Sequence, residues 1–204
     1  MAQPPSVDLT LGTSTAVRLR LATPDDQAAL QAGFAHLSDD SRYQRFFTAM
    51  PKLTSAMLGQ LTDLDGHNRL AIAAFDPTRA SEVGASSDGF GIAVARYVRP
   101  RDDTRNAAEL ALSVIDEYHH LGLGTLLMAS LVMAAQRHRI GILAAYTLGN
   151  NDGMVHLLQR FGGNEVPLDP PEPATRYFEL GVDSALDHAQ INPALVRSLE
   201  PMFS

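Results

Sequence analysis

The chain lacks cysteine altogether. A protein without cysteine forms no disulfide, no thiolate metal site and no cysteine acyl-enzyme. Basic residues are also few, with 16 Lys and Arg against 23 Asp and Glu, which gives a formal net charge of −7. Proteins that bind nucleic acid usually carry a basic footprint, so this balance argues against a nucleic-acid partner.

Long hydrophobic runs are absent as well. No apolar stretch approaches the length of a membrane span, and no charged start precedes an apolar segment, so the sequence predicts neither a membrane partner nor a signal peptide. We therefore expect a cytoplasmic protein. The seven histidines are scattered, except for the adjacent His119 and His120, which have no third ligand at close spacing. This spacing predicts that the protein binds no metal.

The composition is that of a protein with one core. With 204 residues, 45% of them apolar, the chain is long enough to bury a single hydrophobic core. Residues 1–14 are polar and contain proline, and we expect them to be a flexible tail. Residues 15–204 are expected to form one domain. Residues 76–89 are polar, small and glycine-bearing, which predicts a mobile loop between two strands.

The signals for a functional site concentrate in residues 108–140. An apolar, β-favouring run is followed by a polar turn, the segment Gly122-Leu123-Gly124-Thr125 and a long apolar helix. The first amides of a helix have no partner inside it and lie at the positive end of its dipole, so this unit suits an anion. Gly122 and Gly124 lack a Cβ atom and let a phosphate approach the backbone. The third glycine of the dinucleotide motif is absent, so the two glycines alone are a weak signal for a ligand. Close packing of the helix on the strand, without a ligand, is the alternative explanation.

Several segments, in order, resemble the GNAT superfamily of N-acetyltransferases. HHLGLG (His119–Gly124) resembles its Gln/Arg-x-x-Gly-x-Gly/Ala motif. NNDGMVHLLQRFGG (residues 150–163) is similar to its second motif, in which an Asn opens a helix that ends at an aromatic–Gly corner. Upstream, SDDSRYQRFF (residues 38–47) resembles the GNAT domain of the bacterial protein lysine acetyltransferases. The resemblance covers roughly residues 16–163.

The resemblance implies an α/β (α+β) fold, with a central mixed sheet that splays and is flanked by helices. The pantetheine arm of acetyl-CoA would lie in the splay near Val114, and the pyrophosphate would sit on the amides of residues 120–125. Asn151 would hold the pantetheine, or would only cap the helix that follows it. The implied cofactor-binding residues are Val114, His119, His120, Leu121, Gly122, Leu123, Gly124, Thr125 and Asn151.

Two residues of the turn depart from the family pattern. His119 stands where Gln or Arg is usual, and Leu121 stands where a basic residue is common. We expect the loss of a cation to weaken phosphate binding without abolishing it, because the backbone donors remain. In the second motif, Leu158 occupies the place where the superfamily often has a Tyr as general acid. We therefore name no acid, since water can protonate the leaving thiolate.

Glu109 is the candidate catalytic residue. A lysine ammonium has a pKa of about 10.4, so a base must take its proton before the amine can attack. Glu109 lies near the start of an otherwise apolar strand, where we expect burial to raise its pKa toward neutrality. In the lysine acetyltransferase branch, a Glu in a similar Ala-Glu-x-Ala context is the base. The alternative is that Glu109 forms an ion pair with Arg96 or Arg105.

The sequence thus predicts an acetyl-CoA-dependent N-acetyltransferase in which the amine attacks directly within a ternary complex. The resemblance implies a protein lysine as acceptor. A small-molecule amine and a non-catalytic acyl-CoA-binding module are the alternatives. Arg42 and Arg45 lie one helical turn apart, and we interpret them as a solvated face rather than the border of an acceptor entrance.

Overall fold

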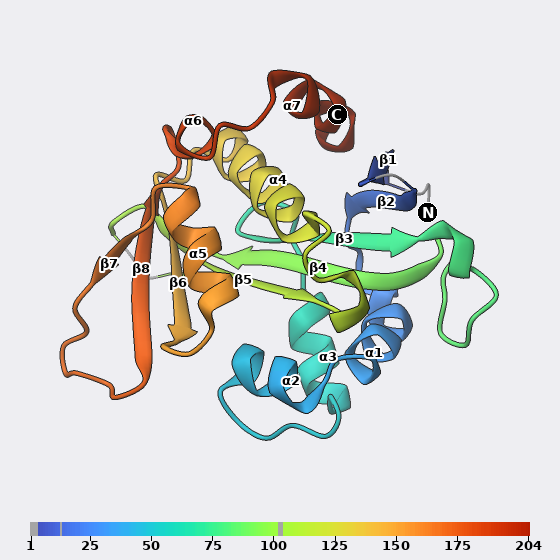
Figure 1. The fold of residues 1–204 in the computed structure, drawn as a ribbon, viewed down its shortest axis with the longest axis horizontal. Coiled ribbons are helices and arrows are strands. Elements are labelled where there is room, and N and C mark those ends of the chain that lie inside the picture. Colours follow the sequence, from blue (N-terminus) through green and yellow to red (C-terminus); the bar gives the residue numbers. More distant parts are fainter. Residues whose placement is uncertain (1–3, 13, 102–103) are drawn as a thin grey trace.

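The computed structural model describes residues 4–12, 14–101 and 104–204. Within these ranges, eight strands form one sheet in the order β1-β2-β3-β4-β5-β6-β8-β7 (Figure 1). Neighbouring strands are antiparallel except for β5 and β6, which are parallel. This mixed sheet confirms the predicted α/β fold. The strands are β1 (Ser6–Leu11), β2 (Thr15–Leu21), β3 (Arg69–Asp76), β4 (Phe90–Val98), β5 (Ala107–Val114), β6 (Ile142–Leu148), β7 (Asn164–Val166) and β8 (Thr175–Gly181).

Helices cover both faces of the sheet. Helices α1, α2 and α3 lie on one face, whereas α4 lies on the other with α6 and α7 beyond it (Figure 1). The helices are α1 (Gln27–Ala35), α2 (Asp39–Phe46), α3 (Ser55–Thr62), α4 (Leu123–Arg137), α5 (Asp152–Arg160), α6 (Ala185–His188) and α7 (Pro193–Leu199). Short 3-10 turns are η1 (Pro24–Asp26), η2 (Pro77–Arg79), η3 (Asp116–Tyr118) and η4 (Glu200–Phe203).

Helix α4 forms the centre of the core. Its residues from Leu126 to Ala135 are all buried, because the sheet covers one side and the C-terminal elements cover the other. A helix that is apolar all round is stable only when it is enclosed in this way. Helix α4 has 15 residues, and no helix in the described part of the chain combines the length and apolarity that crossing a membrane would require.

The flexible tail predicted for residues 1–14 is wrong for Ser6–Leu11. These residues form β1, which pairs along its whole length with residues 15–20 of β2. Val7, Leu9 and Leu11 alternate along it and pack against the core, and this period of two is the signature of a strand with one buried face. Residues 1–3 and 13 of the predicted tail lie outside the described residues. The single domain over residues 15–204 stays a prediction.

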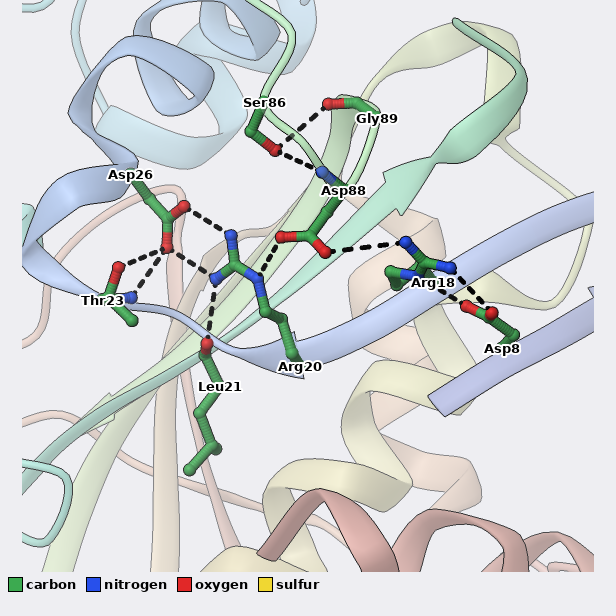
Figure 2. A network of polar contacts seen from close by, with 9 residues as sticks. All are labelled: Asp8, Arg18, Arg20, Leu21, Thr23, Asp26, Ser86, Asp88 and Gly89. Atoms are coloured by element: carbon green, nitrogen blue, oxygen red, sulfur yellow. Dashed lines mark hydrogen bonds and ion pairs between the residues drawn. The ribbon is translucent and has the colours of Figure 1, made fainter. Parts of the chain in front are cut away.

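The loop between β3 and β4 is anchored rather than free. Arg20 on β2 is only 4% exposed, and its guanidinium pairs with Asp26 of η1 and with Asp88 of this loop, each at 2.7 Å (Figure 2). Arg18 extends the network to Asp8 on β1, also at 2.7 Å. The network therefore ties the loop, the start of α1 and two strands together, so the prediction of a mobile loop is wrong at Asp88.

Candidate active site

The sheet opens between its two parallel strands. β5 and β6 pair only where Ala107–Glu109 lie beside Ile142–Ala144. Beyond Glu109 the two strands no longer pair with each other. The backbone groups on the two edges that face this gap are therefore free to bind another molecule. An extended molecule with its own amide groups fits such a gap, because the free edges need hydrogen-bond partners.

A cleft of about 470 Å³ occupies this opening. It brings together the candidate base and eight of the nine predicted cofactor-binding residues, which come from β5, the turn after it, α4 and the start of α5. Leu121 alone of the predicted residues is not part of the lining, and its side chain is 38% exposed. The cleft lining includes Glu109, Val114, His119, His120, Gly122, Leu123, Gly124, Thr125 and Asn151.

The turn before α4 presents free amide groups. His120 and Gly122 adopt positive φ angles of 61° and 86°, and α4 begins at Leu123. Within the described residues, no acceptor is recorded for the backbone N–H groups from His120 to Thr125, and the first bond of the helix is donated by Leu126 to the Gly122 carbonyl. These donors lie at the positive end of a 15-residue helix. The turn is therefore built to receive an anion.

The space beside the two glycines of the turn is open in the described part of the chain. A Cβ atom added at Gly122 would meet nothing within 4 Å, and one at Gly124 would make only an ordinary contact with Leu157. Close packing on a strand, the alternative explanation for the glycines, therefore does not account for Gly122. Its positive φ and the open space beside it fit an approaching phosphate instead.

His119 has a local role. Its Nε2 atom donates to the Val114 carbonyl at 2.9 Å, so the side chain fastens the turn to the end of β5. This contact occupies a carbonyl near the place where pantetheine binding was predicted. Asn151 also makes the contact expected of a cap, because its Oδ1 accepts from the Met154 amide at 3.1 Å. Its side-chain amide nitrogen keeps its hydrogens for other acceptors.

Helix α5 brings a cation that sequence reasoning missed. Arg160 lies beside the start of α4, with its guanidinium 3.4 Å from the Thr125 hydroxyl, and both residues line the cleft together with His156. The turn itself has Leu121 where a basic residue is common. The basic group is supplied instead by Arg160, which lies 35 residues after Thr125 in the chain. Only the packing of α5 against α4 reveals it.

Asp116 holds in place helix α2, which forms one wall of the cleft. Its carboxylate accepts from the Ser38 amide at 2.9 Å and from the hydroxyls of Ser38 and Ser41 at 2.7 and 3.0 Å. Burial alone would raise the pKa of Asp116, but these hydrogen bonds outweigh it and hold the pKa below its usual range. The contact locks α2 to the turn after β5, and this places Arg45 opposite the strand that carries Glu109.

Glu109 faces the cleft, but its surroundings differ from the prediction. The side chain is exposed, so the desolvation that the sequence argument assumed is missing. The predicted ion pair is also absent, since no described Arg or Lys nitrogen lies within 4.0 Å of the carboxylate. Arg105 pairs with Glu179 at 2.8 Å instead. Glu109 is thus an available carboxylate, held at the point where the strands separate.

Position 158, where the superfamily often has a Tyr, supplies no general acid in this chain. Leu158 is fully buried. The Tyr118 hydroxyl, although it belongs to the cleft wall, donates to Asp76, and burial raises the pKa of this tyrosine. The described residues contain no group of three His, Asp or Glu side chains that could hold a metal ion.

A splayed mixed sheet with free amides at the start of the following helix defines the architecture of an acyl-CoA-dependent transferase. The profile of the acetyltransferase (GNAT) family matches residues 52–163, more than half of the chain. The protein therefore belongs to the GNAT family of acetyltransferases.

Solved structures agree with this assignment. The GNAT domain of S. lividans PAT is 25% identical, with a TM-score of 0.74 over 86% of this chain and 96% of that one. A putative acetyltransferase from Salmonella typhimurium, YncA, was solved with its cofactor acetyl-CoA; it is 16% identical, with a TM-score of 0.63 over 82% of this chain and 94% of that one. The fold of that structure thus binds acetyl-CoA.

A cAMP-binding acyltransferase from Mycobacterium smegmatis shares the fold at 22% identity and a TM-score of 0.57. The match covers 98% of this chain but only 57% of that protein, so the chain spans little more than half the length of this relative. The predicted resemblance to the family, made from separated motifs, is confirmed by these comparisons.

Proposed function

We propose that the protein transfers the acetyl group of acetyl-CoA to a primary amine, the side chain of a protein lysine. The observation that carries the proposal is one cleft with two differently equipped ends. At one end are the unpartnered amides of residues 120–125, and at the other is the free carboxylate of Glu109. The first suits a diphosphate, and the second suits an ammonium that must lose its proton.

The cofactor is proposed to lie along the gap between β5 and β6. Its diphosphate accepts from the amides of residues 120–125 and is approached by the Arg160 guanidinium, which supplies the charge that Leu121 lacks. The pantetheine arm follows the free edge of β5 toward Glu109, with the side-chain amide of Asn151 beside it. Acetyl-CoA supplies the activated acyl group, and the protein supplies the amide donors and the gap.

Glu109 is proposed to act as the general base. It takes a proton from the acceptor ammonium, directly or through a water molecule, and the neutral amine then attacks the thioester carbon. The new C–N bond forms, the C–S bond breaks, and the CoA thiolate leaves. Because the carboxylate is exposed, we expect the bound substrates to exclude water from it during the reaction.

The cleft mouth supports a macromolecular acceptor. Phe47 and Tyr146 line the cleft and are 38% and 44% exposed, and Tyr43 on α2, which ends just before Phe47, is 48% exposed. Exposed aromatic side chains at the rim of a cleft are typical of a surface that another protein covers. The similarity to the GNAT domain of S. lividans PAT favours the same choice.

The acceptor class is tested with radiolabelled acetyl-CoA and a cell lysate, separated on a gel. Labelled protein bands support a protein lysine acceptor, whereas label confined to small molecules would establish a small-molecule amine acceptor. Binding of acetyl-CoA without any transfer would make the protein a non-catalytic acyl-CoA-binding module.

A further inference from the structure

Two arginines near Glu109 lack a polar partner among the described residues. Arg45 on α2 and Arg96 on β4 make no hydrogen bond, and no ion pair within 4.0 Å, with any described residue. The guanidinium carbon of Arg45 lies over the ring of Phe46, 4.9 Å from its centroid. The Nε atom of Arg96 is buried without a partner.

Elsewhere the protein pairs its buried arginines. Arg20, the most buried of them, binds two carboxylates at 2.7 Å (Figure 2). Arg69 and Arg99 also have a buried Nε without a hydrogen bond, but their other nitrogens bind Asp63 at 2.7 Å and the His138 carbonyl at 3.2 Å, respectively. Withdrawing a guanidinium from water without an anion is costly, so the half-buried Arg45 and Arg96 are exceptions that require an explanation.

Both arginines line an apolar chamber of about 90 Å³ between the sheet and helices α1 to α3. On the same measure a water molecule needs about 10–15 Å³, so a short carbon chain fits. The chamber adjoins the cleft, because Leu37, Arg45, Ala111 and Ser113 line both. A chain that enters it from the cleft passes Arg45.

The chamber has an excess of positive charge. Burial and the proximity of Arg96 lower the pKa of Arg45 to about 10, with only Glu109 acting in the opposite direction. Burial likewise lowers the pKa of Arg96, and Glu109 and Asp63 oppose it. Asp63 is paired with Arg69, and Asp26, which also lines the chamber, is paired with Arg20, each at 2.7 Å. Glu109 therefore faces Arg45 and Arg96 without an ion pair to either among the described residues, and the balance leaves room for a second anion.

We propose that Arg45 and Arg96 bind a carboxylate that one of the reacting molecules carries at the end of a short carbon chain filling the chamber. The planar fork of a guanidinium matches a carboxylate with two parallel hydrogen bonds. The inference rests on the proposed function, because the chamber opens on the cleft assigned to the thioester. It deepens that function by naming a substrate class.

The carboxylate has two sources with the same chemistry. It belongs either to the acyl group, as in a dicarboxylic acyl-CoA such as succinyl-CoA, or to the acceptor, as the free carboxylate of an amino acid or an acidic side chain near the lysine. In both cases the anion adds to the two arginines and leaves Glu109 free to take the proton of the amine.

Two titrations, one by calorimetry and one by NMR spectroscopy, separate these sources. The first measures binding of S-(3-carboxypropyl)-CoA and S-(3-carbamoylpropyl)-CoA, stable thioethers that differ only in a terminal carboxylate or amide. The second uses saturation-transfer NMR to compare butyrate and butyramide on the protein saturated with CoA. Each titration is repeated on Arg45→Gln and Arg96→Gln, and on Lys52→Gln, which removes an exposed cation one residue before the chamber wall.

A Kd at least 10-fold lower for the carboxylate thioether, lost in Arg45→Gln and Arg96→Gln but kept in Lys52→Gln, establishes the acyl group as the source. If the carboxylate thioether shows no such preference and both arginine variants lose butyrate binding, the acceptor is the source of the carboxylate. Equal binding of each carboxylate and amide pair overturns the proposal, and so does a preference that survives in both variants. If CoA itself fails to bind, the proposed function fails, while butyrate on the free protein still tests the two arginines.

The Gln variants are checked for folding by circular dichroism. If either is unfolded, Arg45→Lys and Arg96→Lys replace it, because lysine keeps the charge but loses the bidentate fork. These variants are expected to keep a preference for the carboxylate that is several-fold smaller. A full preference in both would contradict a guanidinium site.

Discussion

At the scale of single residues, Glu109 carries the largest share of the proposed chemistry. Its identity follows from the family resemblance, and the structure places it in the cleft. Its exposure was not predictable, because a strand that reads as apolar in sequence opens to solvent where its neighbour diverges. The same limit applies to Arg45, Arg96 and Arg160. Each lies far from the turn in sequence, and only the packing of α2, β4 and α5 brings them to the site.

Replacement of Glu109 tests the base directly. Glu109→Gln keeps the size of the side chain and removes the proton acceptor, so we expect kcat to fall by about 10²–10⁴-fold with acetyl-CoA binding unchanged. Steady-state kinetics and calorimetry measure the two quantities. Glu172→Gln, an exposed carboxylate outside the cleft lining, is the matched control. Near-normal turnover in Glu109→Gln would remove this residue from the mechanism.

Gly122 is required for its backbone conformation. It has a φ of +86°, whereas Gly59 is helical within α3, and a Cβ atom at either position would meet nothing within 4 Å. The left-handed conformation costs an L-residue about 1–2 kcal/mol, so Gly122→Ala should destabilise the protein by that amount and weaken CoA binding. Gly59→Ala should stabilise it by up to about 1 kcal/mol. Urea unfolding checks both; equal effects would show that φ does not matter here.

At the scale of elements, the charged network in Figure 2 holds β1, β2, η1 and the loop before β4 together. Arg18 and Arg20 alternate with Val17 and Leu19, and this period of two predicts that both arginines lie on one face of β2. It did not predict that the face is covered, because Asp88 lies 68 residues away from Arg20 in the chain. Period-two alternation was present in β1 too, where the polar composition of the tail hid it.

The network makes the free energy of unfolding depend on pH in the acidic range. Burial alone would raise the pKa of Asp26, but hydrogen bonds from Arg20 and Thr23 hold it below the usual 3.8. A lowered folded-state pKa stabilises the protein above the unfolded value, and this stabilisation is lost as pH falls through the folded value. Asp26→Asn should therefore cost about 3 kcal/mol at pH 7, and the cost should vanish in strong acid.

Urea unfolding of wild type and Asp26→Asn between pH 7 and pH 2 measures this convergence. Asp25→Asn, an adjacent and exposed carboxylate, serves as the control and should follow the wild type throughout. A difference between Asp26→Asn and wild type that stays constant down to pH 2 would show that the charge of Asp26 is irrelevant to stability.

At the scale of the whole molecule, the functional feature is the separation of two parallel strands in an otherwise antiparallel sheet. The sequence predicted the strand before the turn and the helix after it, and the resemblance supplied the splay. The order of the strands and the covering of α4 by the C-terminal helices depend on contacts between distant residues. Local patterns do not contain that information.

The central claim is that the amides of residues 120–125 bind the diphosphate of a thioester carrier. Calorimetry that compares CoA with pantetheine, which lacks the diphosphate and the nucleotide, tests it most directly. The account predicts one saturable site for CoA, with a Kd at least 100-fold lower than that for pantetheine. Equal affinity for the two, or no heat with CoA at millimolar concentration on folded protein, would contradict it.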